Sequence, residues 1–260
     1  MIKLVATDID GTILIPEGKF RKSVKDCIKK IQSQGVKVVL VTGRMNKAAL
    51  LIKDELELKT PVISYQGGLV NDNGKLLYER YLSQEQAENI INWAKKEDIH
   101  LNLYNNDILY SEKNDPEIKR YSSVQNIDYI VKPFSEIKKD KVNKILAIDY
   151  NNAERISKYE KLLPKIFPDL YIIKSTPYFL EFSNPEGSKN CAVKFLQKYW
   201  NIKKEETLTI GDQNNDIALL RAGGIKVAMG NATDELKAEA DYITDTVYND
   251  GFVKAIDKFI

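Results

Sequence analysis

Residues 2–12 read Ile-Lys-Leu-Val-Ala-Thr-Asp-Ile-Asp-Gly-Thr, an apolar run that ends in two carboxylates and a glycine. The segment Ile2–Ala6 is almost continuously apolar, which is typical of a buried strand. Because side chains alternate along a strand, Asp8 and Asp10 are expected to point the same way, with Ile9 turned into the protein. Two carboxylates at one site can hold a hard cation, attack an electrophile or carry a proton. Alone, the same residues also fit a solvated turn after a strand, so the rest of the chain decides between these interpretations.

Polar loops also follow the next two predicted strands. The sequence predicts a helix over residues 20–34, a strand over 36–41, a helix over 45–56 and a strand over 61–65. The second strand ends in Thr42-Gly43-Arg44, and the third is followed by Gln66-Gly67-Gly68. This alternation predicts a parallel sheet with right-handed crossovers, whose ligands bind at the carboxyl ends of the strands.

The alternation stops near residue 69. Asn71-Asp72-Asn73-Gly74 lies between apolar flanks and indicates a hairpin. The segment that follows is expected to contain helices over 84–96 and 153–163, a helix opening at Asp115, and strands near 99–104, 108–111, 142–149, 171–174 and 178–182. This mixture predicts an inserted α+β domain of roughly one hundred residues, which is an ordinary domain size.

The earlier pattern resumes after the insertion. Expected elements are a helix over 187–200, a strand over 207–211, a helix over 217–222, strands over 226–229 and 242–243, and a helix over 250–260. The strand over 207–211 runs into Gly211-Asp212-Gln213-Asn214-Asn215-Asp216. The predicted fold class is therefore α/β, with a discontinuous Rossmann-like parallel-sheet core domain of residues 1–82 and 183–260 and an α+β cap domain inserted at 83–182.

Composition excludes several classes of function. The chain has 260 residues, of which 43% are hydrophobic and 29% charged, as in an ordinary globular protein. Its 39 Lys and Arg and 37 Asp and Glu give a net charge of +2, which does not favour nucleic-acid or anionic-membrane binding. No apolar stretch approaches the roughly 20 residues that span a bilayer, and no signal-peptide pattern is present. Two distant cysteines, Cys27 and Cys191, favour a reducing compartment, so a cytoplasmic protein is expected.

Four polar groups are expected at strand ends or at a helix start: Asp8 with Asp10, Thr42 with Gly43, Lys189, and Asp212 with Asn215 and Asp216. Phosphoryl transfer needs a nucleophile, an oxygen-ligated Mg²⁺, donors for the phosphate oxygens and a fixed positive charge. In this scheme Asp8 attacks and becomes an aspartyl-phosphate, while Asp10 protonates the leaving oxygen and then deprotonates water. Mg²⁺ would bind Asp8, Asp212 and the backbone carbonyl of Asp10.

The order of these motifs resembles that of the haloacid-dehalogenase-like hydrolases. The matching stretches are Asp8-Ile9-Asp10-Gly11-Thr12, Thr42-Gly43-Arg44, the helical Lys189, and Gly211 to Asp216. The long insertion with Leu180-Glu181-Phe182 ahead of Lys189 is similar to that of the Cof-type sugar-phosphate phosphatases, and Asn249-Asp250-Gly251 resembles the C-terminal pattern of that group. The resemblance covers essentially the whole chain and implies a Mg²⁺-dependent phosphatase with a cap domain.

The resemblance also implies a role for each matching residue. It makes Asp8 the nucleophile and a metal ligand, Asp10 the acid/base and a carbonyl ligand, and Asp212 a further metal ligand. Phosphate would be bound by Thr42, Lys189, Asn215 and the amides of Ile9 and Gly43, with Arg44 as a candidate substrate contact and Asp216 orienting Lys189 or a metal-bound water. Gln66 stands where the group often has Asn, and Asn190 stands where it often has Gly, so both bear on substrate contacts.

Taken one at a time, some of these residues have plainer interpretations. Lys189 alone fits a solvated helix residue, and Arg44 fits a surface cap or ion pair. His100 lies among apolar residues and is interpreted as structural. The tyrosines of the insertion suit a substrate-facing surface or an ordinary core. His100 is also the only histidine, which excludes phosphohistidine and Ser-His-Asp mechanisms.

The function predicted from the sequence is Mg²⁺-dependent hydrolysis of a small phosphorylated metabolite, such as a sugar phosphate, under a cap that excludes water. Phosphotransfer to another hydroxyl, as in a mutase, would use the same intermediate. A non-catalytic phosphate-binding regulator would keep the phosphate contacts without turnover. A dinucleotide-binding dehydrogenase fits the α/β rhythm, but no Gly-x-Gly-x-x-Gly follows the first strand. The expected partner is the small metabolite, without nucleic acid or membrane, bound by a monomer or weak homodimer.

Overall fold

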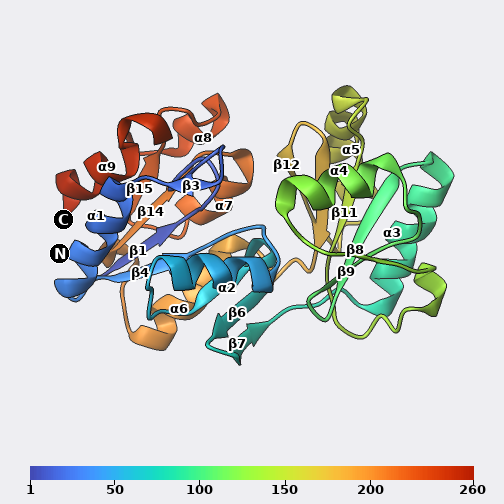
Figure 1. The fold of residues 1–260 in the computed structure, drawn as a ribbon, viewed down its shortest axis with the longest axis horizontal. Coiled ribbons are helices and arrows are strands. Elements are labelled where there is room, and N and C mark those ends of the chain that lie inside the picture. The colour runs from blue at the N-terminus through green and yellow to red at the C-terminus, as the bar shows by residue number, and fades with distance from the viewer. The chain divides into compact units, whose positions relative to one another are not determined.

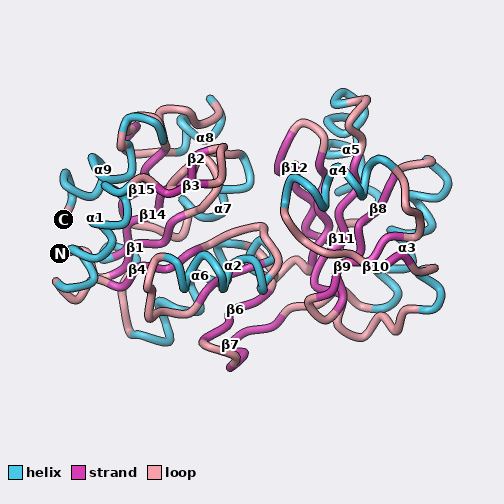
Figure 2. Tube along the Cα trace, viewed as in Figure 1, coloured by secondary structure: helices cyan, strands magenta, loops and turns pink.

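The computed structural model describes residues 1–260 as two compact units (Figures 1 and 2). The core unit comprises residues 1–78 and 189–260, and the insertion unit comprises residues 79–188. An ion pair and a hydrogen bond join the two chain segments that lead into and out of the insertion unit. Arg80 Nε lies 2.5 Å from Glu186 Oε2, and Asn184 Nδ2 donates to the carbonyl of Tyr81 at 2.9 Å. Residues 79–82 and 183–188, which the sequence analysis assigned to the core domain, therefore group with the insertion.

A five-stranded parallel sheet forms the centre of the core unit, in the order β16-β15-β14-β1-β4. Figure 1 labels β15, β14, β1 and β4 of this sheet. The strands are β1 (Leu4–Thr7), β4 (Lys37–Leu40), β14 (Thr207–Gly211), β15 (Ile225–Ala228) and β16 (Tyr242–Ile243). Leu4 of β1 is paired with Thr207 on one side and with Lys37 on the other. The N-terminal strand thus lies between strands from the two ends of the chain, which makes the sheet discontinuous in sequence.

Helices cover both faces of this sheet. They are α1 (Lys22–Ser33), α2 (Asn46–Glu55), α6 (Lys189–Trp200), α7 (Ile217–Leu220), α8 (Asp234–Glu239) and α9 (Gly251–Phe259). Val5 packs in one core cluster with buried residues of α1, α2 and α9. Its neighbours Leu4 and Ala6 pack in another cluster with residues of α6 and α7. β1 is an almost continuous apolar run because both of its faces are buried.

The third predicted strand pairs differently from the expectation. β5 (Val62–Ser64) was expected to extend the parallel sheet, but it pairs antiparallel with β6 (Leu69–Asp72). Its parallel contact with the main sheet is one bridge, between Val41 and Ile63. The chain reverses direction after β5 through residues that include Gln66, whose φ is 59°. The next strand therefore returns beside β5.

The hairpin predicted around residues 71–74 is confirmed. β6 lies beside β7 (Lys75–Glu79), and Asn73 and Gly74 between them have φ values of 51° and 93°. Three short elements of the core unit were not predicted: β2 (Leu14–Ile15), β3 (Lys19–Phe20), whose second residue was assigned to the predicted helix over 20–34, and α8. Two-residue strands and a helix of fewer than two turns are too short to show a hydrophobic period.

A six-stranded sheet forms the insertion unit, in the order β10-β9-β8-β11-β13-β12. The elements are α3 (Gln84–Glu97), β8 (His100–Asn105), β9 (Ile108–Ser111), α4 (Pro116–Gln125), β10 (Ile130–Val131), β11 (Val142–Ile148), α5 (Ala153–Ile166), β12 (Tyr171–Thr176) and β13 (Phe179–Ser183). One face packs on α3 and α5, for example Leu103 and Ile145 against Ile90 and Ile156. On the other face, the hydroxyl of Tyr104 donates to that of Tyr121 of α4 at 2.5 Å. Neither unit contains a helix whose length and apolar character would let it cross a membrane.

A buried ion pair lies on the strands of this sheet. Lys144 Nζ of β11 lies 2.6 Å from Glu181 Oε2 of β13, and the two side chains are 4% and 5% exposed. The ammonium also lies over the ring of Tyr104, 5.1 Å from its centroid. A buried charge that loses its partner keeps its desolvation cost.

Replacing Lys144 by methionine is therefore expected to lower the free energy of unfolding by about 3–5 kcal/mol, because Glu181 stays buried without its cation. Urea unfolding followed by tryptophan fluorescence measures this, since Trp93 packs on Tyr159 and Phe182 inside the insertion unit. The control is Lys138→Met, which removes an ammonium whose ion pair with Asp140 is exposed. An equally stable Lys144→Met protein would show that the pair is dispensable.

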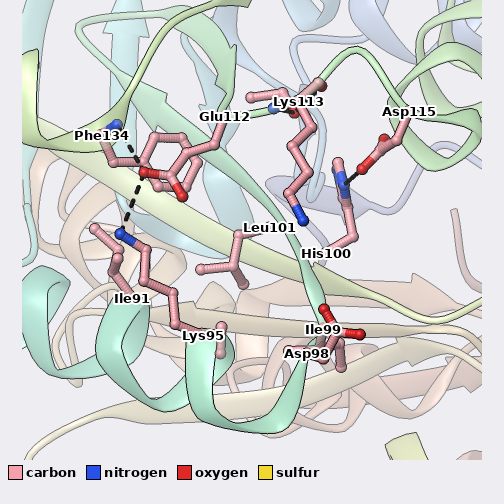
Figure 3. Close-up of a pocket in the computed structure, with 12 residues that line it drawn as sticks. Ile91, Lys95, Asp98, Ile99, His100, Leu101, Glu112, Lys113, Asp115 and Phe134 are labelled. Carbon is pink, nitrogen blue, oxygen red and sulfur yellow. Dashed lines mark hydrogen bonds and ion pairs between the residues drawn. The ribbon is translucent and has the colours of Figure 1, made fainter.

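A cavity of about 220 Å³ opens in the insertion unit beside α3, β8 and the start of α4 (Figure 3). His100 lies at its edge. The Nδ1 of His100 lies 2.8 Å from Asp115 Oδ2 and its Nε2 lies 2.8 Å from Asn102 Oδ1, so both ring nitrogens are engaged. This agrees with the structural interpretation of His100. None of the predicted site residues lines this cavity.

Candidate active site

The acids of the first and last motifs lie at the carboxyl ends of β1 and β14. Asp8 follows β1, and its amide donates to the carbonyl of Ile210 at 3.0 Å, which keeps the chain aligned with β14 beyond the end of the strand. Asp212 follows directly after Gly211, the last residue of β14. Carboxylate oxygens of Asp8, Asp212 and Asp216 lie within 4.8 Å of one another, and all three residues are buried. Adjacent parallel strands thus bring together acids that lie about two hundred residues apart in sequence, as expected at the carboxyl edge of an open α/β sheet.

Lys189 is in contact with this acidic cluster. It begins α6 and is 1% exposed, and its Nζ lies 2.6 Å from Asp8 Oδ1 and 2.5 Å from Asp216 Oδ1. Burial alone lowers the pKa of a lysine, but the charges of Asp216 and Asp8 outweigh it and hold the pKa of Lys189 above its usual value. Lys189 is therefore a fixed positive charge. Oδ2 of Asp8 accepts no hydrogen bond, so one oxygen of Asp8 is held and the other is open.

The cluster holds more negative than positive charge, because three carboxylates face one ammonium. Burial, followed by the charge of Asp216, raises the pKa of Asp8 well above its usual value, and Lys189 opposes this only in part. Burial and the charge of Asp216 also raise the pKa of Asp212 to about 7. A cation relieves such repulsion by favouring the ionised carboxylates, and oxygen ligands suit a hard metal ion. The residues present therefore fit a bound metal.

Neighbouring polar groups fix the carboxylates of the last motif. Asp212 Oδ1 accepts from the hydroxyl of Thr12 at 2.8 Å, and Oδ2 accepts from Gln213 Nε2 at 3.0 Å. Asp216 Oδ2 accepts from the amides of Asp212 and Gln213 at 3.0 and 3.2 Å. Gly11 has a φ of 81°, and a Cβ there would overlap the Asp212 carboxylate. The glycine of the first motif thus allows the first and last loops to approach each other.

Asp10 lies outside the acidic cluster. Its carboxylate accepts from Arg44 Nε at 2.8 Å and from Arg44 Nη2 at 2.5 Å, and its side chain is 53% exposed. Ile9 is fully buried, as predicted. Strand alternation does not orient Asp10, because β1 ends at Thr7 and the chain then turns. The two candidate residues Asp10 and Arg44 therefore bind each other.

The predicted phosphate contacts at the end of β4 form a second group. The hydroxyl of Thr42 accepts from the backbone amide of Arg44 at 3.1 Å, and the carbonyl of Thr42 accepts from the backbone amide of Gln66 at 3.0 Å. Asn215 Nδ2 donates to Gln66 Oε1 at 3.1 Å. A Cβ on Gly43 would overlap the Gln66 side chain. Gln66 therefore contacts each of the three candidate phosphate residues Thr42, Gly43 and Asn215.

Two residues of the site, Thr12 and Gln213, were not predicted as part of it, and Gln66 was named only as bearing on substrate contacts. Thr12 and Gln213 lie inside two of the motifs, and both donate to the carboxylate of Asp212. Their position beside the acids is a signal that could have identified them. Gln66 directly follows a predicted strand, where ligand-binding residues of α/β sheets occur. Its contact with Asn215 joins positions 149 residues apart, which no local pattern reveals.

Comparisons with known proteins agree over the whole chain. A family profile described as haloacid dehalogenase-like hydrolase matches residues 5–256. The phosphatase YwpJ of Bacillus subtilis is 29% identical over 271 residues, covering 94% of this chain and 95% of the relative. The 5-amino-6-(5-phospho-D-ribitylamino)uracil phosphatase YcsE of the same species is 30% identical over 258 residues, covering 98% and 94%. The solved structure of BT4131, a HAD subclass IIB sugar phosphatase, has a TM-score of 0.88 and 25% identity, covering 99% of this chain and 98% of that chain.

Proposed function

The chain belongs to the haloacid dehalogenase-like hydrolases and is a phosphatase, and we propose that it hydrolyses a small phosphomonoester, such as a sugar phosphate, with bound Mg²⁺. The observation that supports this proposal most strongly is the hydrogen bonding of the two carboxylate oxygens of Asp8. One of its oxygens is held by Lys189 at 2.6 Å, and the other accepts no hydrogen bond. A buried carboxylate with one open oxygen beside a fixed cation is suited to attack phosphorus.

In the proposed reaction, Asp8 Oδ2 attacks phosphorus and the bond to the leaving oxygen breaks, which gives an aspartyl-phosphate and an alcohol. Asp10 supplies the proton that the leaving oxygen takes up. Asp10 then accepts a proton from the water that attacks phosphorus, and inorganic phosphate leaves while the carboxylate of Asp8 is restored. For these steps, Asp10 exchanges its ion pair with Arg44 for the reacting oxygens.

The remaining candidate residues bind the metal and the phosphate. Asp8, Asp212 and the backbone carbonyl of Asp10 would hold Mg²⁺, whose charge would reduce the repulsion between the anionic nucleophile and the anionic phosphate. The phosphate oxygens would be bound by Thr42, Lys189, Asn215 and the amides of Ile9 and Gly43, with Arg44 as a further contact. Asp216 holds Lys189 through its Oδ1 at 2.5 Å and so orients the ammonium.

The proposal predicts that turnover needs a divalent metal. An aryl phosphate should be hydrolysed with added Mg²⁺ and not with excess chelator, and Mg²⁺ should raise the melting temperature because it offsets the repulsion among the buried acids. Asp212→Asn, which removes a ligand charge, should raise the Mg²⁺ concentration needed for half-maximal activity at least about tenfold. Asp241→Asn is the control, since this acid pairs with Lys226 at the surface. Undiminished hydrolysis in chelator would contradict metal dependence.

Substrate class is tested with a panel of phosphorylated sugars, cofactors and nucleotides in the presence of Mg²⁺. The proposal expects a small phosphomonoester to give the highest kcat/KM and to release free phosphate. Adding an excess of acceptor sugar separates hydrolysis from the mutase alternative, because a phosphotransferase would form a new sugar phosphate instead of inorganic phosphate. The absence of turnover on the whole panel would favour a regulator that binds phosphate without hydrolysing it.

A further inference from the structure

The side-chain amide of Asn215 is held from one end only. Its Nδ2 donates to Gln66 Oε1 at 3.1 Å, whereas its Oδ1 is buried and has no hydrogen-bond partner. The bond to Gln66 is therefore the interaction that decides which way the amide faces. An amide nitrogen carries two N–H groups, so one of them is still available after Gln66 is bound.

Gln66 also determines the direction in which that nitrogen lies. The backbone amide of Gln66 donates to the carbonyl of Thr42 at 3.0 Å, and the Gln66 side chain fills the space beside Gly43. Because Nδ2 of Asn215 binds the end of Gln66, the nitrogen is turned toward the loop of Thr42 and Gly43. In the proposed function this loop binds phosphate. An amide N–H can donate to a phosphate oxygen, whereas an amide oxygen would be repelled by it.

The backbone around Gln66 adopts a conformation that is unfavourable for ordinary residues. Tyr65 and Gln66 have φ values of 52° and 59°, in the left-handed region that favours glycine. Two backbone hydrogen bonds hold the segment in this shape, from Tyr65 to the carbonyl of Arg44 and from Gln66 to that of Thr42, both at 3.0 Å. Strained residues of this kind cluster at functional sites, where the surrounding structure holds a side chain in a required place.

We propose that Gln66 is a positioning residue for phosphate binding, which keeps the nitrogen of the Asn215 amide facing the loop of Thr42 and Gly43. The inference rests on the proposed function and adds to it a residue that need not touch the substrate itself. Without the Gln66 side chain, no hydrogen bond prevents the Asn215 amide from turning over. Its oxygen would then face the phosphate in part of the population, and binding would weaken.

The first test replaces Gln66 by methionine, which keeps the length of the side chain and removes both polar ends. Inorganic phosphate, titrated calorimetrically in the presence of Mg²⁺, should bind about tenfold more weakly, as expected when an oriented hydrogen bond to a charged group is lost. The KM for an aryl phosphate should rise by a similar factor with a much smaller change in kcat, because ground state and transition state lose the same contact. Unchanged phosphate affinity in a folded Gln66→Met protein would overturn the proposal.

The second test is a double-mutant cycle with Asn215→Ala. If Gln66 acts through Asn215, Gln66→Met should cost nothing further in the Asn215→Ala background, whereas a general structural effect would add to the first loss. The matched control is Gln197→Met, since Gln197 is another buried glutamine, bonded to Thr207 and to the carbonyl of Ala222. This control should leave phosphate affinity unchanged. Equal losses from Gln66→Met in both backgrounds would contradict the positioning role.

A measurement on the unsubstituted protein covers the case in which Gln66→Met does not fold. The side-chain N–H₂ signals of Asn215, identified by their absence from the spectrum of Asn215→Ala, should shift when inorganic phosphate and Mg²⁺ are added. An unchanged pair of signals at saturating phosphate would overturn the proposal. Phosphate binding is read without turnover, so a protein that binds phosphate but hydrolyses nothing would refute the proposed function and leave this inference standing.

Discussion

Replacing Asp8 by asparagine is expected to abolish phosphatase activity, with kcat for an aryl phosphate falling by at least about 10⁴-fold, as for the loss of a covalent nucleophile. Asparagine keeps the size of the side chain but presents an amide, which does not form an acyl phosphate. It also removes the negative charge that faces Lys189 Nζ at 2.6 Å. Steady-state kinetics at saturating Mg²⁺ measure the loss.

The matched control for this substitution is Asp54→Asn. Asp54 is an exposed acid on α2 of the same unit, so its change to asparagine alters the net charge equally without touching the cluster. The control should keep the kcat of the unsubstituted protein. Substantial activity in folded Asp8→Asn would exclude Asp8 as the nucleophile and would point to direct attack of water on the substrate.

Replacing Lys189 by methionine should have the second-largest effect, because it changes both activity and stability. Turnover should fall by about 10²–10³-fold, the usual cost of losing a group that stabilises developing charge. The free energy of unfolding without metal should fall by about 3–5 kcal/mol, since Asp8 and Asp216 would stay buried without their cation. Added Mg²⁺ should recover part of this stability by supplying positive charge. Urea unfolding without Mg²⁺ measures the loss of stability, and urea unfolding with Mg²⁺ measures how much of it is recovered.

The control for this experiment lies on the same helix. Lys194 of α6 is exposed, so Lys194→Met removes an ammonium of the same kind from the surface and should leave the unfolding midpoint and kcat unchanged. An unchanged midpoint in Lys189→Met would show that the ammonium does not balance the buried acids. The proposed electrostatic structure of the site would then be wrong.

The centre of the parallel core sheet could be predicted because β1, β4 and β14 are buried on both faces. β14 and β16 occupy the residues predicted for them, 207–211 and 242–243, and β1 and β4 differ by one or two residues at their ends. β1 and β4 are short, mainly apolar runs that end at polar loop residues. Their ends can therefore be recognised from the sequence alone. The loops that carry Asp8 and Asp212 follow from the same signal.

The surroundings of Lys189 could not be predicted from its own segment of sequence. A lysine at a helix start is usually exposed, and only pairing with acids makes its full burial tolerable. Those partners, Asp8 and Asp216, lie 181 and 27 residues away along the chain. The family resemblance supplied what the local pattern lacked, because it placed Lys189 in the same site as the acids.

The pairing of Asp10 with Arg44 and the position of Gln66 could not be predicted for a different reason, because Asp10 and Gln66 lie in turns outside the strands. The alternation rule for side chains holds within a strand, but β1 ends at Thr7, and beyond it turn geometry sets the direction of Asp10. Gln66 lies in a reversal of positive φ after β5. Turns of this kind depend on the contacts of the surrounding fold, and Gln66 carries none of the glycine or asparagine signal that usually marks them.

The central claim, that Asp8 forms a covalent phosphoenzyme, is tested most directly by rapid acid quenching during turnover. Peptide mass spectrometry of the quenched protein should find one phosphoryl group on the peptide that contains Asp8. Borohydride reduction before digestion should convert Asp8 to homoserine, because it reduces an acyl phosphate and leaves a free carboxylate. Phosphate on any other residue, or turnover without a phosphoenzyme, would contradict the account.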